Sequence, residues 1–180
     1  MVYIEHPHLI HNELNQARML ILENITMLGE GAQFNFSFYG YDWLTANEGH
    51  PENEEGYMGY YYNLSSKPWA PDVISPKPTA SAYAASSFLL EGHVSRGPIT
   101  NLRGNAYGYN FSNSDGSDIV FVLWNIYENQ DITLNVGDVK SVDVIDWMGN
   151  SISKKVSNGL ITIAVGKEPV YIKRLNANLL

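Results

Sequence analysis

The sequence contains no cysteine among its 180 residues. This absence excludes disulfide bonds, thiolate metal sites and a cysteine nucleophile together. Basic residues are scarce as well: 11 Lys and Arg stand against 19 Asp and Glu, which gives a net charge of −8. Nucleic-acid binding requires a basic surface, and a membrane helix requires about 20 consecutive apolar residues, which the chain lacks. We therefore expect neither nucleic acid nor a membrane as a partner.

The N-terminal residues, MVYIEHPHLIH, lack the basic and apolar segments of a signal peptide. They leave the localisation of the chain open. The first residues instead form a short apolar, β-prone run that starts without any preceding segment. This beginning suggests a chain cut from something longer.

The first half of the sequence alternates between the periodicities of strands and helices. The order is strand, helix, strand, long loop and helix, which is typical of a β/α repeat with parallel strands and outer helices. The expected ranges are Met1–Ile4, Asn12–Leu28, Ala32–Tyr39, Gly40–Lys77 for the loop, and Thr79–Glu91.

Beyond Pro98 the apolar residues alternate with a period of two, and turn sequences such as Asn158-Gly159 separate the runs. Eight short strands at this spacing predict a β-sandwich or barrel. We expect an α+β chain with a partial β/α segment at residues 1–92 and an antiparallel β-sandwich at residues 93–180. The expected strands are Ile99–Arg103, Ala106–Ser112, Asp118–Trp124, Asp131–Val136, Ser141–Asp146, Ser151–Val156, Leu160–Val165 and Pro169–Arg174.

No phosphate-binding glycine loop, zincin helix or nucleophile elbow is present in the sequence. His6, His8 and His11 could form a metal cluster, but no pattern of supporting carboxylates accompanies them, and histidines of a loop or core edge are the better interpretation. We expect no metal and no cofactor.

Glu5 is the first candidate for catalysis because it ends the strand that opens the β/α repeat. Enzymes with β/α barrels place catalytic groups at this end of their strands. The alternative is a solvated glutamate with no special function. Position alone leaves both interpretations open.

Aromatic residues after the second strand form a candidate sugar-binding surface. Flat rings stack on the apolar faces of sugars, and an aspartate accepts hydrogen bonds from hydroxyl groups. Alternatively, the tyrosines pack the long loop onto its own domain. The expected substrate-binding residues are Tyr41, Asp42 and Trp43, extended by Tyr57 and Tyr60 and by their neighbours Tyr61 and Tyr62.

The order of these features resembles the end of a clan A glycoside hydrolase, a retaining (β/α)8 barrel with a C-terminal β-sandwich. The resemblance implies that Glu5 is the nucleophile, that carbohydrate is the partner and that a parent enzyme is secreted or periplasmic. It rests on Val2-Tyr3-Ile4-Glu5, Gly31-Ala32, Tyr41-Asp42-Trp43, Pro76-Lys77-Pro78 and the closing run Gly166–Ile172.

The sequence departs from that family because six strands of the barrel are missing, and the general acid/base with them. Retaining hydrolysis requires two carboxyl groups about 5–5.5 Å apart. Asp42, Glu54 and Glu55 do not match the missing role, so we expect the isolated chain to be inactive. Open strand edges also predict self-association through the incomplete barrel, or packing of its helices on the sandwich. The alternatives are a carbohydrate-binding module without activity and a purely structural sandwich.

Overall fold

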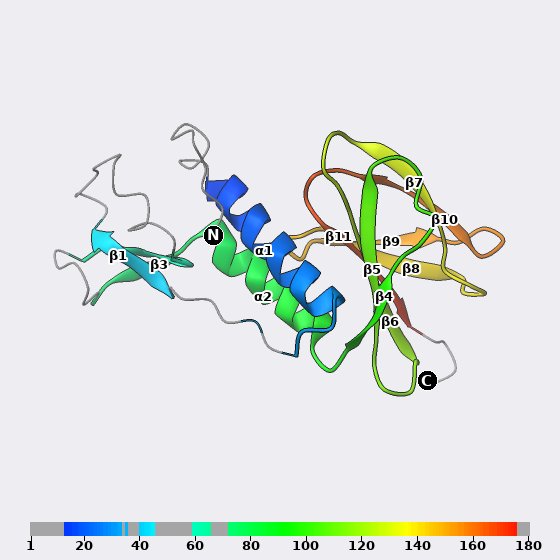
Figure 1. Cartoon of the computed structure of the whole chain (residues 1–180), viewed down its shortest axis with the longest axis horizontal. Coiled ribbons are helices and arrows are strands. Elements are labelled where there is room, and N and C mark those ends of the chain that lie inside the picture. The colour runs from blue at the N-terminus through cyan, green and yellow to red at the C-terminus, as the bar shows by residue number, and fades with distance from the viewer. Residues whose placement is uncertain (1–12, 34, 36–39, 46–58, 66–71, 176–180) are drawn as a thin grey trace. The chain divides into compact units, whose positions relative to one another are not determined.

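The structure is a computed structural model that describes residues 13–33, 35, 40–45, 59–65 and 72–175 (Figure 1). Within these residues the chain is α+β, with two helices, α1 (Glu13–Gly29) and α2 (Pro78–Leu90), and three sheets. The chain divides into a first unit, Met1–Ile21 with Phe36–Ala84, and a second unit, Leu22–Asn35 with Ala85–Leu180. Because the units share both helices, the domain boundary expected after residue 92 stays a prediction.

The bounds of both helices agree to within one residue with those expected from the periodicity of the sequence. In α1, Ala17, Ile21 and Ile25 are completely buried and lie on one stripe of the helix. Gly31, with φ of +94°, follows its end, where a left-handed residue satisfies the last carbonyl groups. Helix α2 begins at Pro78, whose missing N–H is not needed in a first turn. Neither helix is long and apolar enough to cross a membrane, within the described residues.

The segment expected to be a long loop, Gly40–Lys77, contains a three-stranded sheet, so this prediction is wrong. The sheet has the order β1-β2-β3, with β2 parallel to β1 and antiparallel to β3. Its strands are too short to show a recognisable alternating pattern in the sequence. The bounds are Tyr41–Thr45 for β1, Tyr61–Asn63 for β2 and Ile74–Pro76 for β3.

The two strands expected before this sheet fall mostly outside the described residues. Met1–Ile4 lies there completely. Of Ala32–Tyr39, the structure describes Ala32, Gln33 and Asn35, and none of them belongs to a strand. The residues Tyr41-Asp42-Trp43, which were expected to follow a strand, lie on strand β1 itself.

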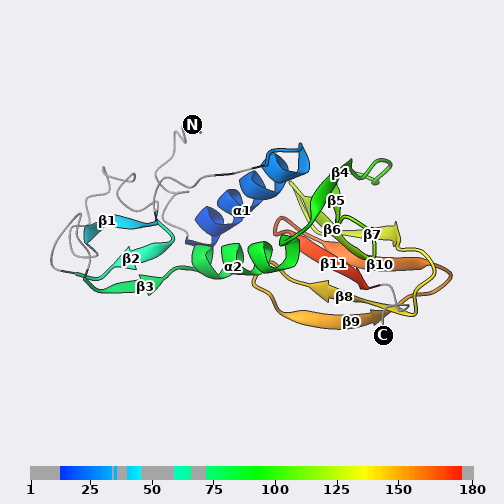
Figure 2. The same cartoon turned by 90° about the horizontal axis from the view of Figure 1, so that it is seen from below.

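The second unit contains a six-stranded sheet of order β4-β5-β6-β11-β8-β9 and a two-stranded sheet of β10 and β7 (Figure 2). Seven of the eight expected strands are confirmed. Their observed bounds are Ala106–Ser112 for β5, Asp118–Asn125 for β6, Gln130–Asn135 for β7, Ser141–Ile145 for β8, Ser151–Lys155 for β9, Leu160–Val165 for β10 and Val170–Leu175 for β11.

The eighth expected strand, Ile99–Arg103, is wrong. The observed strand is β4, which covers Val94–Pro98 and pairs with β5. After Pro98 the chain turns, and Asn101 takes a φ of +67°, which a regular strand does not allow. The period of two was expected to begin beyond Pro98, whereas Pro98 itself ends an edge strand, where a missing N–H is tolerated.

The two sheets of the second unit enclose a core of aliphatic side chains, which makes this unit sandwich-like. Leu123 of β6 lies in this core, while Val120 and Val122 are also completely buried. Strand β6 is therefore buried on both faces, as expected from its continuous apolar run. The other buried members of the core are Ile132, Leu134, Val136, Val142, Ile161, Ile163, Val165 and Ile172.

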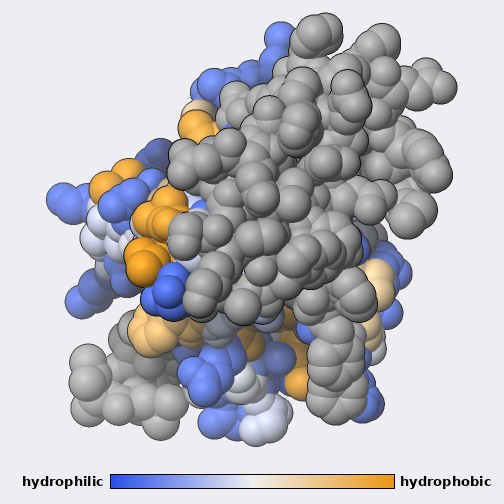
Figure 3. Space-filling view, turned by 90° about the vertical axis from the view of Figure 1, so that its left-hand side faces the viewer, coloured by the Kyte–Doolittle hydropathy of each residue, from blue (hydrophilic) through white to orange (hydrophobic). Residues whose placement is uncertain are grey.

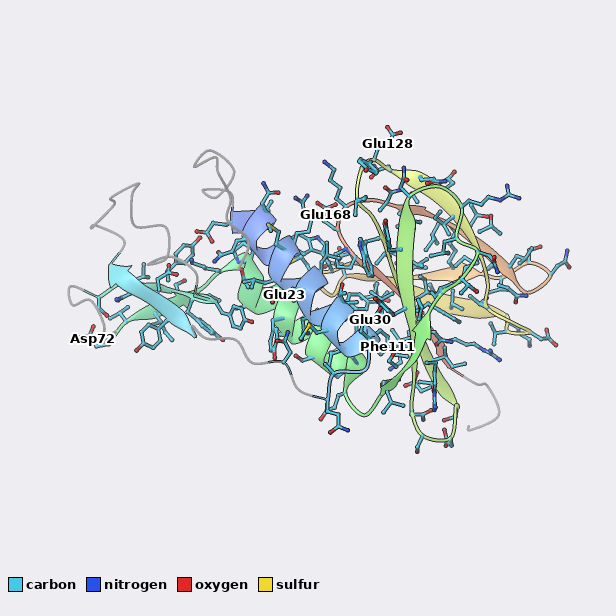
Figure 4. The ribbon with its side chains drawn as sticks, viewed as in Figure 1. Glu23, Glu30, Asp72, Phe111, Glu128 and Glu168 are labelled. Carbon is cyan, nitrogen blue, oxygen red and sulfur yellow. The ribbon has the colours of Figure 1, made fainter. Side chains whose placement is uncertain are left out.

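Two tyrosines of the six-stranded sheet are kept neutral by their surroundings. The Tyr109 hydroxyl donates a hydrogen bond of 2.5 Å to Glu30, and the Tyr109 and Phe111 ring centroids lie 6.4 Å apart; Glu30 and Phe111 are labelled in Figure 4. Burial, with Glu30 adding to it, raises the pKa of Tyr109 to about 12. Burial also raises the pKa of Tyr171, which has no exposed surface, to about 12.

We predict that the second unit loses stability in alkali because of these tyrosines. The ordinary pKa of tyrosine is 10.0. Between pH 10.0 and about 12, each of these hydroxyl groups is therefore still protonated in the folded state but has lost its proton in the unfolded state. Stability is therefore complete below pH 10.0 and falls above it, by roughly 2 to 3 kcal/mol for each tyrosine. Urea unfolding over this pH range measures the fall. Tyr109→Phe should reduce this loss of stability, whereas Tyr107→Phe, at a half-exposed position, is the matched control and should not. A Tyr109→Phe variant that loses as much stability as the parent would contradict the role of Tyr109.

Candidate functional site

Lys77 is the most deeply buried charged residue that the structure describes, with a side chain that is 0% exposed. It connects β3 to α2, since Pro76 ends the strand and Pro78 begins the helix. Its backbone N–H donates to the carbonyl of Tyr60, at a distance of 3.0 Å. The two prolines fix the local backbone, so the lysine side chain extends into the interior of the first unit.

Asp42 of β1 is the main partner of this ammonium group. Its Oδ1 atom accepts a hydrogen bond from Lys77 Nζ at 2.7 Å and another from the backbone N–H of Gly59 at 3.0 Å. The Asp42 side chain is 2% exposed. A carboxylate buried to this degree requires such partners, because unpaired burial of a charge costs several kcal/mol.

Gly59 can donate to Asp42 because it has no side chain. A Cβ atom at this position would lie 2.1 Å from the carbonyl carbon of Tyr41 and 2.3 Å from the Asp42 nitrogen. Both are backbone atoms, which cannot move aside as a flexible side chain can. The glycine therefore permits the close approach of two chain segments that the Asp42 carboxylate then joins.

Glu13 and Tyr62 complete the surroundings of the lysine. Glu13 Oε2, in the first turn of α1, lies 3.8 Å from Lys77 Nζ, and the Tyr62 ring centroid on β2 lies 5.2 Å from it. We refer to Glu13, Asp42, Tyr62 and Lys77 as the Lys77 cluster. It brings together α1, β1, β2 and the beginning of α2.

The cluster holds two carboxylates and one ammonium group, and burial raises the pKa of two of its members, Asp42 and Tyr62. Burial raises the pKa of Asp42 above its usual value, and the Lys77 ammonium and the Gly59 N–H offset only part of this effect. Burial, followed by the charge of Glu13, raises the pKa of Tyr62. With Asp42 engaged by internal donors, the arrangement orients neighbouring chain segments rather than presenting a free acid to solvent.

The predicted site residues lie in different surroundings. Tyr41 is 39% exposed, whereas Asp42 is buried and paired with Lys77. Trp43 lies on β1, and its side chain is outside the described part of the chain. The Tyr60 ring stacks on Tyr83 of α2 with a centroid distance of 5.2 Å. Glu5, Tyr57 and the three N-terminal histidines lie outside the described residues. The catalytic role of Glu5 and the sugar-binding roles of Tyr41, Asp42, Trp43, Tyr57 and Tyr60 stay predictions.

Sequence reasoning missed Lys77 as a member of the site. Pro76-Lys77-Pro78 was interpreted only as the opening of a helix. The available signal was one of composition: Lys67 and Lys77 are the only Lys or Arg residues between positions 40 and 80, in a segment with six acids. Among the described residues no group of three or more His, Cys, Asp or Glu side chains could hold a metal ion.

We predict that Lys77→Met destabilises the first unit by about 3–5 kcal/mol, because it leaves the buried Asp42 carboxylate without its ammonium partner. Asp42→Asn together with Lys77→Met should cost less than the sum of the single changes, since the double variant removes both charges. Urea unfolding of the three variants measures this coupling. Lys155→Met, at an exposed position of β9, is the matched control and should stay within about 0.5 kcal/mol of the parent. Equal effects of Lys77→Met and Lys155→Met would refute the role of the buried pair.

No family model matches the sequence, and no curated protein matches it significantly. The fold is similar to a solved structure described as a family 39 glycoside hydrolase from the gut symbiont Bacteroides cellulosilyticus WH2, with a TM-score of 0.66 and 20% identity. The similarity covers 89% of this chain and 30% of that enzyme, so the chain spans less than a third of its length. At this identity the likeness shows a shared fold, which extends over nearly all of this chain and corresponds to part of a glycoside hydrolase.

Proposed function

We propose that this chain is the C-terminal part of a retaining glycoside hydrolase of clan A, with residues 1–92 as the last two β/α units of its barrel and residues 93–180 as the appended sandwich. The similarity to a family 39 glycoside hydrolase over 89% of the chain is the observation that carries the proposal. The sequence supports it independently, through the order of Glu5, Tyr41-Asp42-Trp43 and Pro76-Lys77-Pro78.

In this proposal Glu5 is the nucleophile that attacks the anomeric carbon and forms a covalent glycosyl-enzyme intermediate. A second carboxyl group protonates the leaving oxygen and then activates the water that releases the sugar. Asp42 does not suit this second role, because its Oδ1 atom already accepts hydrogen bonds from Lys77 and Gly59. The acid/base therefore belongs to a part of the enzyme beyond these 180 residues. Tyr41, Trp43, Tyr57 and Tyr60 are the proposed contacts to the carbohydrate.

We predict that the 180-residue chain does not hydrolyse aryl glycosides, since one carboxyl group of an interdependent pair supports little catalysis. Release of the chromophore, compared with that from the Glu5→Gln variant, measures this directly. Turnover by the chain that disappears in Glu5→Gln would overturn the prediction. The reading frame upstream of Met1 tests the proposal itself: we expect it to encode six further β/α units, and Glu5→Gln in that longer protein should reduce kcat by several orders of magnitude. A frame without these units would contradict the proposal.

Self-association of the isolated chain is a further part of this proposal. Leu64, Val73 and Ile74, next to or on strands β2 and β3, are each about half exposed. Apolar surface is also visible among hydrophilic side chains in Figure 3. We propose that in the isolated chain a second copy covers these exposed apolar residues.

Light scattering should therefore give the purified chain a mass above 20.2 kDa. Changing Val73 and Ile74 together to Glu should return the mass to that of a monomer, because the charges oppose burial. Ile152→Glu is the matched control, since Ile152 is an exposed apolar residue of β9 in the sandwich. A parent chain that is already monomeric would exclude self-association.

A further inference from the structure

Three residues form a row across the sheet of the first unit. Tyr41 of β1 pairs with Tyr61 of β2, and Tyr61 pairs with Pro76 of β3. Residues directly opposite one another on neighbouring strands point to the same face of a sheet, and the strands lie about 4.8 Å apart. Two tyrosines and a proline therefore occupy neighbouring positions on one face of the sheet, and we refer to Tyr41, Tyr61 and Pro76 as the ring row.

Each member of the ring row is followed in the sequence by a member of the Lys77 cluster. Asp42 follows Tyr41, Tyr62 follows Tyr61, and Lys77 follows Pro76. Successive side chains of a strand point to opposite faces. The sheet thus directs its charged pair to one face and its rings to the other.

The exposure of most of these side chains agrees with this division, whereas Asn63, two residues after Tyr61, is buried. Tyr41 is 39% exposed, Tyr61 is 37% exposed and Pro76 is exposed, whereas Asp42 and Lys77 are buried. Tyrosines that stay more than a third exposed on one face of a sheet forgo part of the roughly 1.5–3 kcal/mol that full burial of a ring contributes to stability. Such a row is typical of a binding surface.

We propose that the ring row binds a neutral saccharide. A sugar ring has an apolar face of C–H groups and a rim of hydroxyl groups, which suits a flat phenol ring with its own hydroxyl. The charge of the segment argues against an acidic sugar: positions 40 to 80 contain Asp42, Glu48, Glu52, Glu54, Glu55 and Asp72 against Lys67 and Lys77. Of these two lysines, Lys77 is buried on the opposite face.

The ligand class rests on the proposed function, but the row itself does not require Glu5. It adds Pro76 to the contacts expected from the sequence, which already include Tyr41 and Tyr61. It also separates Tyr41 from Asp42, which lies on the other face of the sheet. Binding by the row can therefore be measured on the chain as it is, without any hydrolysis.

Titration calorimetry of the 180-residue chain with xylohexaose, cellohexaose and mannohexaose tests the inference. We expect at least one of these neutral oligosaccharides to bind, and Tyr61→Ala or Tyr41→Ala to weaken that binding by about tenfold or more through the lost stacking surface. Tyr61→Phe keeps the ring and should stay within about threefold of the parent. Tyr107→Ala, at a half-exposed tyrosine of the sandwich, is the matched control and should have no effect.

Three results would overturn the inference: no binding of any of the neutral oligosaccharides, equal binding by the parent and by Tyr61→Ala, or tighter binding of an oligogalacturonate. A fourth would identify a protein as the occupant, namely an oligomeric parent that Tyr61→Ala converts to a monomer. Thermal unfolding followed by circular dichroism confirms that each variant is folded. If the upstream frame encodes no barrel while the oligosaccharide still binds, the proposed function fails and the ring row stands. If the longer protein hydrolyses glycosides but the row binds no oligosaccharide, the proposed function stands and the ring row fails.

Discussion

The buried ammonium group of Lys77 is the constraint on which the first unit depends. An ammonium group in a protein interior loses its hydration, and only close carboxylates and well-placed acceptors offset that loss. Asp42 supplies the contact at 2.7 Å, and Glu13 lies at 3.8 Å. Because these partners come from a strand and from a helix that is distant in sequence, the lysine can be satisfied only when the elements of the unit are assembled.

The second unit is organised by a different kind of interaction. Its core consists of aliphatic side chains from both sheets, and the strand β6 is buried on both faces. Hydrophobic burial is not directional, so it stabilises this unit without selecting particular partners. The contrast explains why the sandwich could be predicted from an apolar pattern, whereas the geometry of the first unit depends on specific polar contacts.

The helices and seven strands of the sandwich follow from periodicity, since each is long enough to repeat its pattern. Strands β2 and β3 have three residues each, and their sheet includes a parallel pair that joins residues far apart in sequence. No local pattern reports such pairing. Lys77 was overlooked for the same reason, because a lysine between two prolines has no apolar period and its partner Asp42 is 35 residues away. That the side chains of Tyr41 and Asp42 point to opposite faces follows only from their position on strand β1, which the sequence did not predict.

The ion pair and the ring row are two consequences of one strand register. A slip of β1 by one residue would turn Asp42 to solvent and bring Tyr41 to the face that Lys77 occupies. The lysine would then be buried without its nearest carboxylate, at a cost of several kcal/mol. A buried pair of this kind contributes little net stability compared with apolar residues of similar volume, yet it penalises the wrong register heavily. In the carbohydrate binding that we propose, the Lys77 cluster therefore acts indirectly: by fixing which face of β1 is buried, it keeps Tyr41 on the opposite, exposed face.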